Sequence, residues 1–163
     1  MNKIVSTTVL LFITTGALAA PPPLLREAVQ RWAAPATVGR FEFSLVDLNA
    51  DKRLDAVVRV LDADRCGNGG CVLLTFKATP EGYERVGDSG YVAKPIYVMK
   101  EVISGWTSLA GVVGMAQGAG VRPIRYMGSE YRSNPIMRGQ IVVAKTGHDA
   151  QDLGDPLTFE VVE

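Results

Sequence analysis

Short runs of alternating apolar and polar residues recur along most of the chain, separated by glycine, proline, asparagine or aspartate. Phe41, Phe43 and Leu45 alternate with polar residues, which is the two-residue period of a half-buried strand. Further strands are predicted at 55–61, 71–79, 83–88, 91–99, 106–113, 121–127, 140–145 and 157–162. A strand roughly every ten residues is typical of antiparallel all-β proteins. We therefore expect an all-β fold, mainly antiparallel, arranged as a sandwich or a propeller-like sheet.

One segment, 21–36, has a helical period instead. Its apolar residues recur at roughly helical spacing, and Pro23 is suited to a first helical turn because proline lacks an amide hydrogen. Pro35 is expected to end the helix. The sequence thus predicts one short helix ahead of the strands.

Residues 1–19 have the three parts of a secretory signal peptide. Lys3 gives a short positive end, an apolar stretch follows over 4–13, and the small residues at 17–19 form a cleavage site. A membrane anchor is the alternative, but a spanning helix needs about 20 continuous apolar residues, and polar residues and glycine interrupt this run at 14–16. We therefore expect cleavage after Ala19, a single β-rich domain over 20–163, and a periplasmic or secreted location.

Charge and size limit the function of the mature chain. Removing the signal takes away one lysine and no acidic residue, which leaves 16 Lys and Arg against 17 Asp and Glu. Nucleic-acid binding usually requires a strongly basic face, so we expect no nucleic-acid partner. We also expect no membrane span in the mature form.

The two cysteines, Cys66 and Cys71, occur in the sequence CGNGGC. In an oxidising compartment two nearby cysteines with a glycine-rich spacer are expected to pair. A redox pair usually has two intervening residues, and a structural zinc site needs four ligands. A structural disulfide at a hairpin tip is the favoured interpretation.

An acidic loop between two predicted strands suggests metal chemistry. Asp47, Asn49, Asp51 and Asp55 lie at positions 1, 3, 5 and 9 of this loop, and the carbonyl of Arg53 lies at position 7. Calcium takes six to eight oxygen ligands from loops of this kind. The glutamate that closes an EF-hand loop at position 12 is replaced by a valine.

With strands on both sides, the loop resembles the calcium turns of FG-GAP and integrin-type β-propeller repeats. The resemblance covers residues 41–60 and implies calcium as a cofactor. Lys52 stands where that pattern has a glycine, which favours the positive φ of the turn. A metal-free Asx turn, in which Asp and Asn side chains bind their own backbone, is favoured over bound calcium.

The wider sequence, with its Asp loop, CGNGGC, the dipeptide Gly105-Trp106 and YRSNP near 131–135, is similar to small exported proteins of Gram-negative bacteria. That resemblance implies export but no activity.

The sequence gives little support for a catalytic site. His148 is the only histidine, and no Gly-x-Ser-x-Gly elbow accompanies it. A hydrolase built on dispersed carboxylates remains open, with Glu81, Glu84, Glu101 and Glu130 as its candidates. The glycine-rich run 111–120 lacks the Lys-Ser/Thr of a phosphate-binding loop.

Trp106, Tyr126 and Tyr131 lie near several arginines and are the candidate partner-binding residues, because such side chains are enriched at interface hot spots. For Trp106, core burial is the favoured interpretation. The leading hypothesis is a non-enzymatic exported binding module, in one version an inhibitor or immunity-type protein against a periplasmic cell-wall-cleaving enzyme. A calcium-stabilised structural or envelope-associated domain is the second hypothesis.

Overall fold

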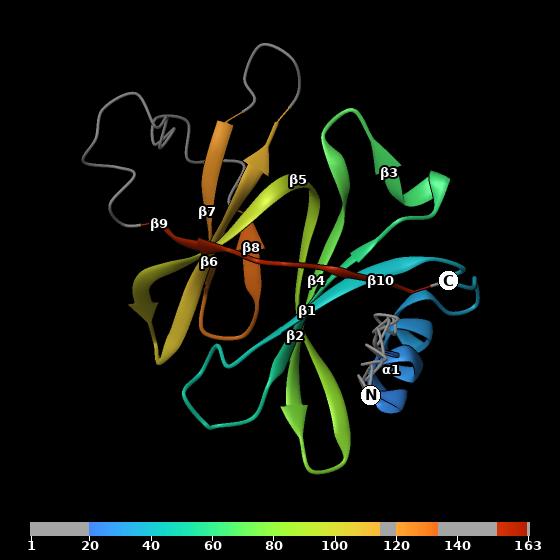
Figure 1. Ribbon diagram of the computed structural model, residues 1–163, viewed down its shortest axis with the longest axis horizontal. Coiled ribbons are helices and arrows are strands. Elements are labelled where there is room, and N and C mark those ends of the chain that lie inside the picture. The colour runs from blue at the N-terminus through green and yellow to red at the C-terminus, as the bar shows by residue number, and fades with distance from the viewer. Residues whose placement is uncertain (1–19, 115–119, 134–152, 163) are drawn as a thin grey trace, which may run out of the picture.

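The computed structural model describes residues 20–114, 120–133 and 153–162. It contains one α-helix, one short 3-10 helix and ten strands, named in chain order in Figure 1. The elements are α1 Pro23–Ala33, β1 Phe41–Val46, β2 Asp55–Val60, η1 Ala63–Arg65, β3 Cys66–Gly67, β4 Gly70–Thr79, β5 Gly82–Ile103, β6 Trp106–Val113, β7 Gly120–Tyr126, β8 Tyr131–Ser133, β9 Leu153–Pro156 and β10 Glu160–Val162. This confirms the predicted all-β class with a short N-terminal helix. The predicted strand 140–145 and His148 lie outside the described residues.

The strands form one sheet in the order β10-β1-β2-β4-β5-β6-β7-β8, with mainly antiparallel neighbours. The first half of β5 pairs with β4 and its second half pairs with β6. The chain end crosses the sheet, because β9 pairs with β5 while β10 pairs with β1 (Figure 1). The last described segment therefore ties the two halves of the sheet together.

The predicted strands 83–88 and 91–99 are parts of the single strand β5, which is 22 residues long. Gly90, with φ +66°, and register shifts against β4 bend the strand without breaking it. The bend brings Gly87 beside Tyr131 of β8, where the strands pair in parallel. A Cβ at Gly87 would lie 2.7 Å from the Cβ of Tyr131, so only glycine allows this approach.

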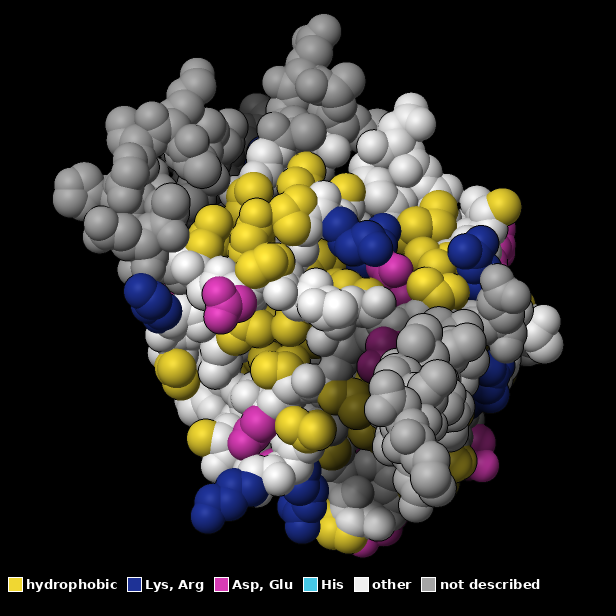
Figure 2. Space-filling model, viewed as in Figure 1, with side chains coloured by type: hydrophobic (Ala, Val, Ile, Leu, Met, Phe, Trp, Pro, Cys, Tyr) yellow, Lys and Arg dark blue, Asp and Glu magenta, His cyan; other side chains and the backbone are white. Residues whose placement is uncertain are grey.

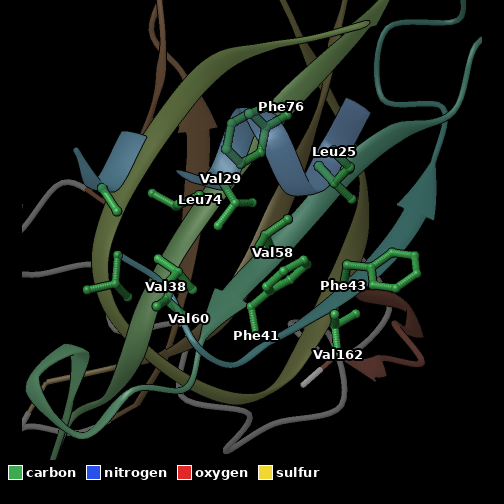
Figure 3. Close-up of a cluster of buried hydrophobic side chains, with 14 residues drawn as sticks. Leu25, Val29, Val38, Phe41, Phe43, Val58, Val60, Leu74, Phe76 and Val162 are labelled. Atoms are coloured by element: carbon green, nitrogen blue, oxygen red, sulfur yellow. The ribbon is translucent and has the colours of Figure 1, made fainter. Parts of the chain in front are cut away.

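One face of the sheet packs against α1. Leu25 and Val29 are fully buried on the helix, and Figure 3 shows them over Val58, Leu74 and Phe76 of the strands. Full burial of a Leu or Val side chain contributes roughly 1.5–3 kcal/mol. The helix begins at Pro23, as predicted, and ends at Ala33, two residues before Pro35.

The opposite face encloses a second cluster, which contains Leu48, Val57, Leu73, Val86, Val92, Ile96, Trp106, Leu109, Ile124 and Tyr131. Figure 2 shows apolar side chains over much of the middle of one surface, with most Lys and Arg side chains towards its outline. The side chains coloured there form no single basic block.

The disulfide between Cys66 and Cys71 is present and confirms that prediction. It joins β3 to β4 as cross-strand partners and so closes the hairpin at their tip.

Candidate binding end and the Asp47–Asp55 loop

The loop between β1 and β2 is folded by its own Asp and Asn side chains. Asp47 accepts hydrogen bonds from the backbone amides of Asn49 (3.3 Å) and Lys52 (2.8 Å). Asn49 Oδ1 accepts one from the amide of Asp51 (3.0 Å), and Asp51 Oδ1 accepts one from the amide of Arg53 (2.9 Å). These are the hydrogen bonds of an Asx-rich turn.

The turn forces Lys52 into the left-handed region, at φ +68°. Ala50, two residues earlier, has φ +58°. A side-chain-bearing residue pays about 1 kcal/mol or more for this conformation. Lys52 therefore has the positive φ for which the calcium-turn pattern uses glycine.

Asp55 anchors the loop to the sheet. Its side chain is completely buried, and its two oxygens accept hydrogen bonds from the amides of Leu48 (3.0 Å) and Ala78 (2.8 Å). Burial raises the pKa of this carboxyl above its ordinary value, while the two amides act in the opposite direction. Asp55 thus joins the loop to the end of β4.

The fit of this loop to calcium depends on which oxygens stay available. Within the described segments, no three His, Cys, Asp or Glu side chains form a group that could hold a metal ion. The carboxylates of Asp47 and Asp51 each already accept amide hydrogens, although a carboxylate oxygen has more than one lone pair. The calcium set Asp47, Asn49, Asp51, Arg53 and Asp55 stays a prediction.

The three aromatic residues that the sequence singles out form one cluster. The rings of Trp106 and Tyr126 stack at 4.7 Å, and Tyr131 meets both edge-on at 5.8 Å and 5.5 Å. Trp106 is 9% exposed and Tyr131 is fully buried. The Tyr131 hydroxyl donates to the carbonyl oxygen of Thr107 (2.6 Å). Core burial, the favoured interpretation for Trp106, is what the structure shows, and of the three rings only that of Tyr126 belongs to a partly exposed residue.

Three chain connections meet around this aromatic cluster: 47–54, 104–105 and 127–130. We call them the three-turn end (lower left in Figure 1). The amide of Thr107 donates to the carbonyl of Leu48 (2.7 Å), which joins the first connection to the start of β6. The Trp106–Tyr126 stack joins the start of β6 to the end of β7.

The three-turn end carries exposed apolar side chains that the strand pattern did not single out. Val102 is 61% exposed, Met127 57% and Leu54 53%. Each lies at or beside one of the three connections. The sequence does contain a signal for these exposed residues. Each is an apolar residue at a predicted turn or strand end, where a polar residue is usual.

The side chains at this end are mixed in charge. Lys77 lies over the ring of Trp106 at 6.0 Å from its centroid. Lys52 and Arg53 are exposed beside Asp51, and the pKa of Asp51 is lowered mainly by its hydrogen bond to the Arg53 amide. The end therefore carries exposed apolar side chains together with charges of both signs.

The candidate carboxylates for hydrolysis are dispersed. Glu101 accepts a bidentate pair from Arg125 (2.8 and 3.0 Å) and a hydrogen bond from Ser108 (2.8 Å). The Arg125 hydrogen bonds hold the pKa of Glu101 below its usual range, which suits an ion-pair anchor better than a general acid. Glu130 pairs with Arg132, while Glu81 and Glu84 are exposed. The hydrolase hypothesis gains no support from these contacts.

The sequence matches no family model, no curated protein and no solved structure. No helix among the residues placed in the structure has the length and apolar character needed to span a membrane.

Proposed function

We propose that this chain is a non-enzymatic exported binding module that docks on another exported protein through its three-turn end. The observation that carries the proposal is the location of Val102, Met127 and Leu54. They are the three most exposed large apolar side chains among the described residues, and all three lie at this end. Clustered exposed apolar side chains are typical of protein-binding surfaces.

The turns at this end rest on a rigid base. The Asp55 carboxylate fixes the first connection, and the stacked rings of Trp106 and Tyr126 support the other two. A binding surface that is ordered before the partner arrives loses less conformational entropy on binding. In this proposal Trp106 and Tyr131 support the contact surface, and Tyr126 contributes directly to it.

The partner class follows from the expected compartment. The signal-peptide pattern of residues 1–19 and the Cys66–Cys71 disulfide both support an oxidising, exported setting. In its most specific form the proposal makes the chain an inhibitor or immunity-type protein that blocks a periplasmic cell-wall-cleaving enzyme. Loops on a rigid β scaffold are suited to entering an enzyme cleft.

A matched pair of double variants tests this proposal. L54S/M127S removes apolar contacts at the three-turn end, and L24S/V161S removes two exposed apolar side chains elsewhere. Each tagged protein is titrated into a cell-wall lysis assay with periplasmic enzymes from the producing organism. We expect inhibition by the wild type and by L24S/V161S, and at least about tenfold weaker inhibition by L54S/M127S. Equal inhibition by both variants would remove the three-turn end as the docking surface.

The calcium-stabilised structural domain is the second candidate. It is favoured by the backbone of the loop, because Lys52 has the positive φ for which the calcium-turn pattern uses glycine. It predicts calcium-dependent thermal stability and no specific partner. The two candidates therefore differ in both the melting experiment and the inhibition experiment.

A further inference from the structure

A cleft of about 370 Å³ lies between α1 and the β4–β5 hairpin. The hydroxyl of its wall residue Tyr83 donates to the carbonyl oxygen of Leu54 in the 47–54 connection (3.4 Å). Trp32 and Tyr83 bring aromatic rings to its wall, Arg31 and Arg85 bring guanidinium groups, and Glu84 also lines it. Ala28 and Phe76 are buried residues that form its inner side. The volume is at the lower end of the range for ligand pockets, about 300–1,000 Å³, which suits one small ring-shaped ligand.

Trp32 has two further contacts. The indole Nε1 of Trp32 donates to Asp88 Oδ2 (3.3 Å), and the guanidinium of Arg65 lies 5.0 Å from the indole ring. Tyr83 packs against the helix-facing core. The apolar C–H face of a sugar ring is suited to stacking on such rings, since they offer a large and rigid apolar surface.

The two arginines differ in what engages them. Arg31 donates to the carbonyl oxygen of Tyr83 (3.4 Å) and lies 3.9 Å from Glu27. Arg85 is exposed, and no hydrogen bond or ion pair within the described residues engages its side chain. Its register partner on β4 is Phe76, so its side chain lies on the sheet face that α1 covers.

Guanidinium groups recognise carboxylates through paired, charge-assisted hydrogen bonds. Trp32 and Arg85 line the same cleft, so a ring that stacks on Trp32 can offer a carboxylate to Arg85. We infer that this cleft binds a carboxylate-bearing sugar, with Trp32 and Tyr83 stacking on the ring and Arg85 receiving the carboxylate. This inference does not rest on the docking role of the three-turn end.

The chain has only two tryptophans, so nuclear magnetic resonance offers a direct test. The indole N–H signal of Trp32, assigned with W32F, is followed while sugars are added, and the Trp106 signal is the internal reference. N-acetylmuramic acid and glucuronic acid supply the carboxylate from two different sources. N-acetylglucosamine has the ring of the first without its carboxylate.

We expect at least one of the two acidic sugars to shift the Trp32 signal saturably, with N-acetylglucosamine at least about tenfold weaker. Binding of N-acetylmuramic acid alone supports a ligand from the cell-wall glycan, and binding of glucuronic acid alone supports a uronic-acid polymer. R85Q should weaken binding about tenfold, whereas K100Q, which neutralises another exposed cation on β5, should not. The inference is overturned if neither acidic sugar shifts the Trp32 signal. It is also overturned if N-acetylglucosamine binds as tightly as the acidic sugars, or if R85Q binds them as tightly as the wild type does.

Discussion

Replacement of Asp55 is the sharpest test of how the acidic loop is held. Asp55→Asn keeps the size and shape of the side chain but offers one acceptor oxygen where the carboxylate has two. The amide of either Leu48 or Ala78 would then face an NH2 group. A hydrogen bond to a charged group contributes about 1.5–3 kcal/mol, and a buried donor without a partner costs about 1–3 kcal/mol.

The neutral asparagine avoids the cost of burying a charge, which offsets part of this loss. We therefore expect Asp55→Asn to lower the free energy of unfolding by about 2 kcal/mol. Asp55→Ala leaves two buried amides without a partner and should cost about 3–6 kcal/mol. Urea unfolding followed by circular dichroism measures both. Asp51→Asn, an exposed carboxylate of the same loop, is the control and should change stability little. If Asp55→Asn unfolds with the wild type and the control, Asp55 does not anchor the loop.

The stability difference between the wild type and Asp55→Asn should depend on pH, and the pKa of Asp55 determines the direction. Burial raises the pKa of Asp55 above its ordinary value of 3.8, so the folded state binds the proton more tightly than the unfolded state. The stability that this linkage contributes is complete below that value and decreases as the pH rises through the folded pKa. The difference in stability between the wild type and Asp55→Asn should therefore be larger at acid pH than at neutral pH.

Three further outcomes are expected. Lys52→Gly should raise the free energy of unfolding by up to about 1 kcal/mol, because glycine adopts the positive φ of this position without strain. Arg53→Gly is the control and should lower the free energy of unfolding, because φ is not positive at Arg53. Equal effects of the two substitutions would contradict the backbone argument. Glu101→Gln should make stability depend less on pH in the acid range. Arg125 lowers the pKa of Glu101, so the stability that this ion pair contributes in the wild type is lost as the pH falls below 4.5. The same acid dependence in both proteins, measured by urea unfolding, would contradict this ion pair. The melting temperature should be the same in millimolar calcium and in chelator, because the loop carboxylates already accept hydrogen bonds from backbone amides. A melting temperature that rises with calcium in the wild type but not in Asp47→Asn would instead establish the calcium-stabilised alternative.

Local chemistry was sufficient to predict several parts of the molecule. The alternation at Phe41–Leu45 correctly predicts the strand β1, although the strand is not half-buried, because Glu42 and Ser44 are buried as well as Phe41 and Phe43. Pro23 and Pro35 bracket α1 through the missing amide hydrogen of proline. Cys66 and Cys71 pair because the glycines between them let the chain turn back within six residues. These features depend on residues close together in sequence.

Other features depend on partners that are distant in sequence. Asp55 looks like a metal ligand from its spacing, but the Ala78 amide that it binds is 23 residues away. The strand pattern breaks at Gly90, yet β5 continues because its hydrogen bonding passes from β4 to β6. Trp106 and Tyr131 are buried because rings from three strands meet. The exposure of Leu54 and Met127 follows only from that assembled arrangement.

Site-specific photo-crosslinking tests the docking proposal most directly. A photoreactive amino acid replaces Met127 at the three-turn end or, in the matched control, Leu24 on α1; both native side chains are exposed. Cells of the producing organism are irradiated, and the adducts are separated by gel electrophoresis and identified by mass spectrometry. We predict one discrete adduct with an exported cell-wall-cleaving enzyme from position 127 and none from position 24. No adduct from position 127, or the same adduct from both positions, would contradict binding through the three-turn end.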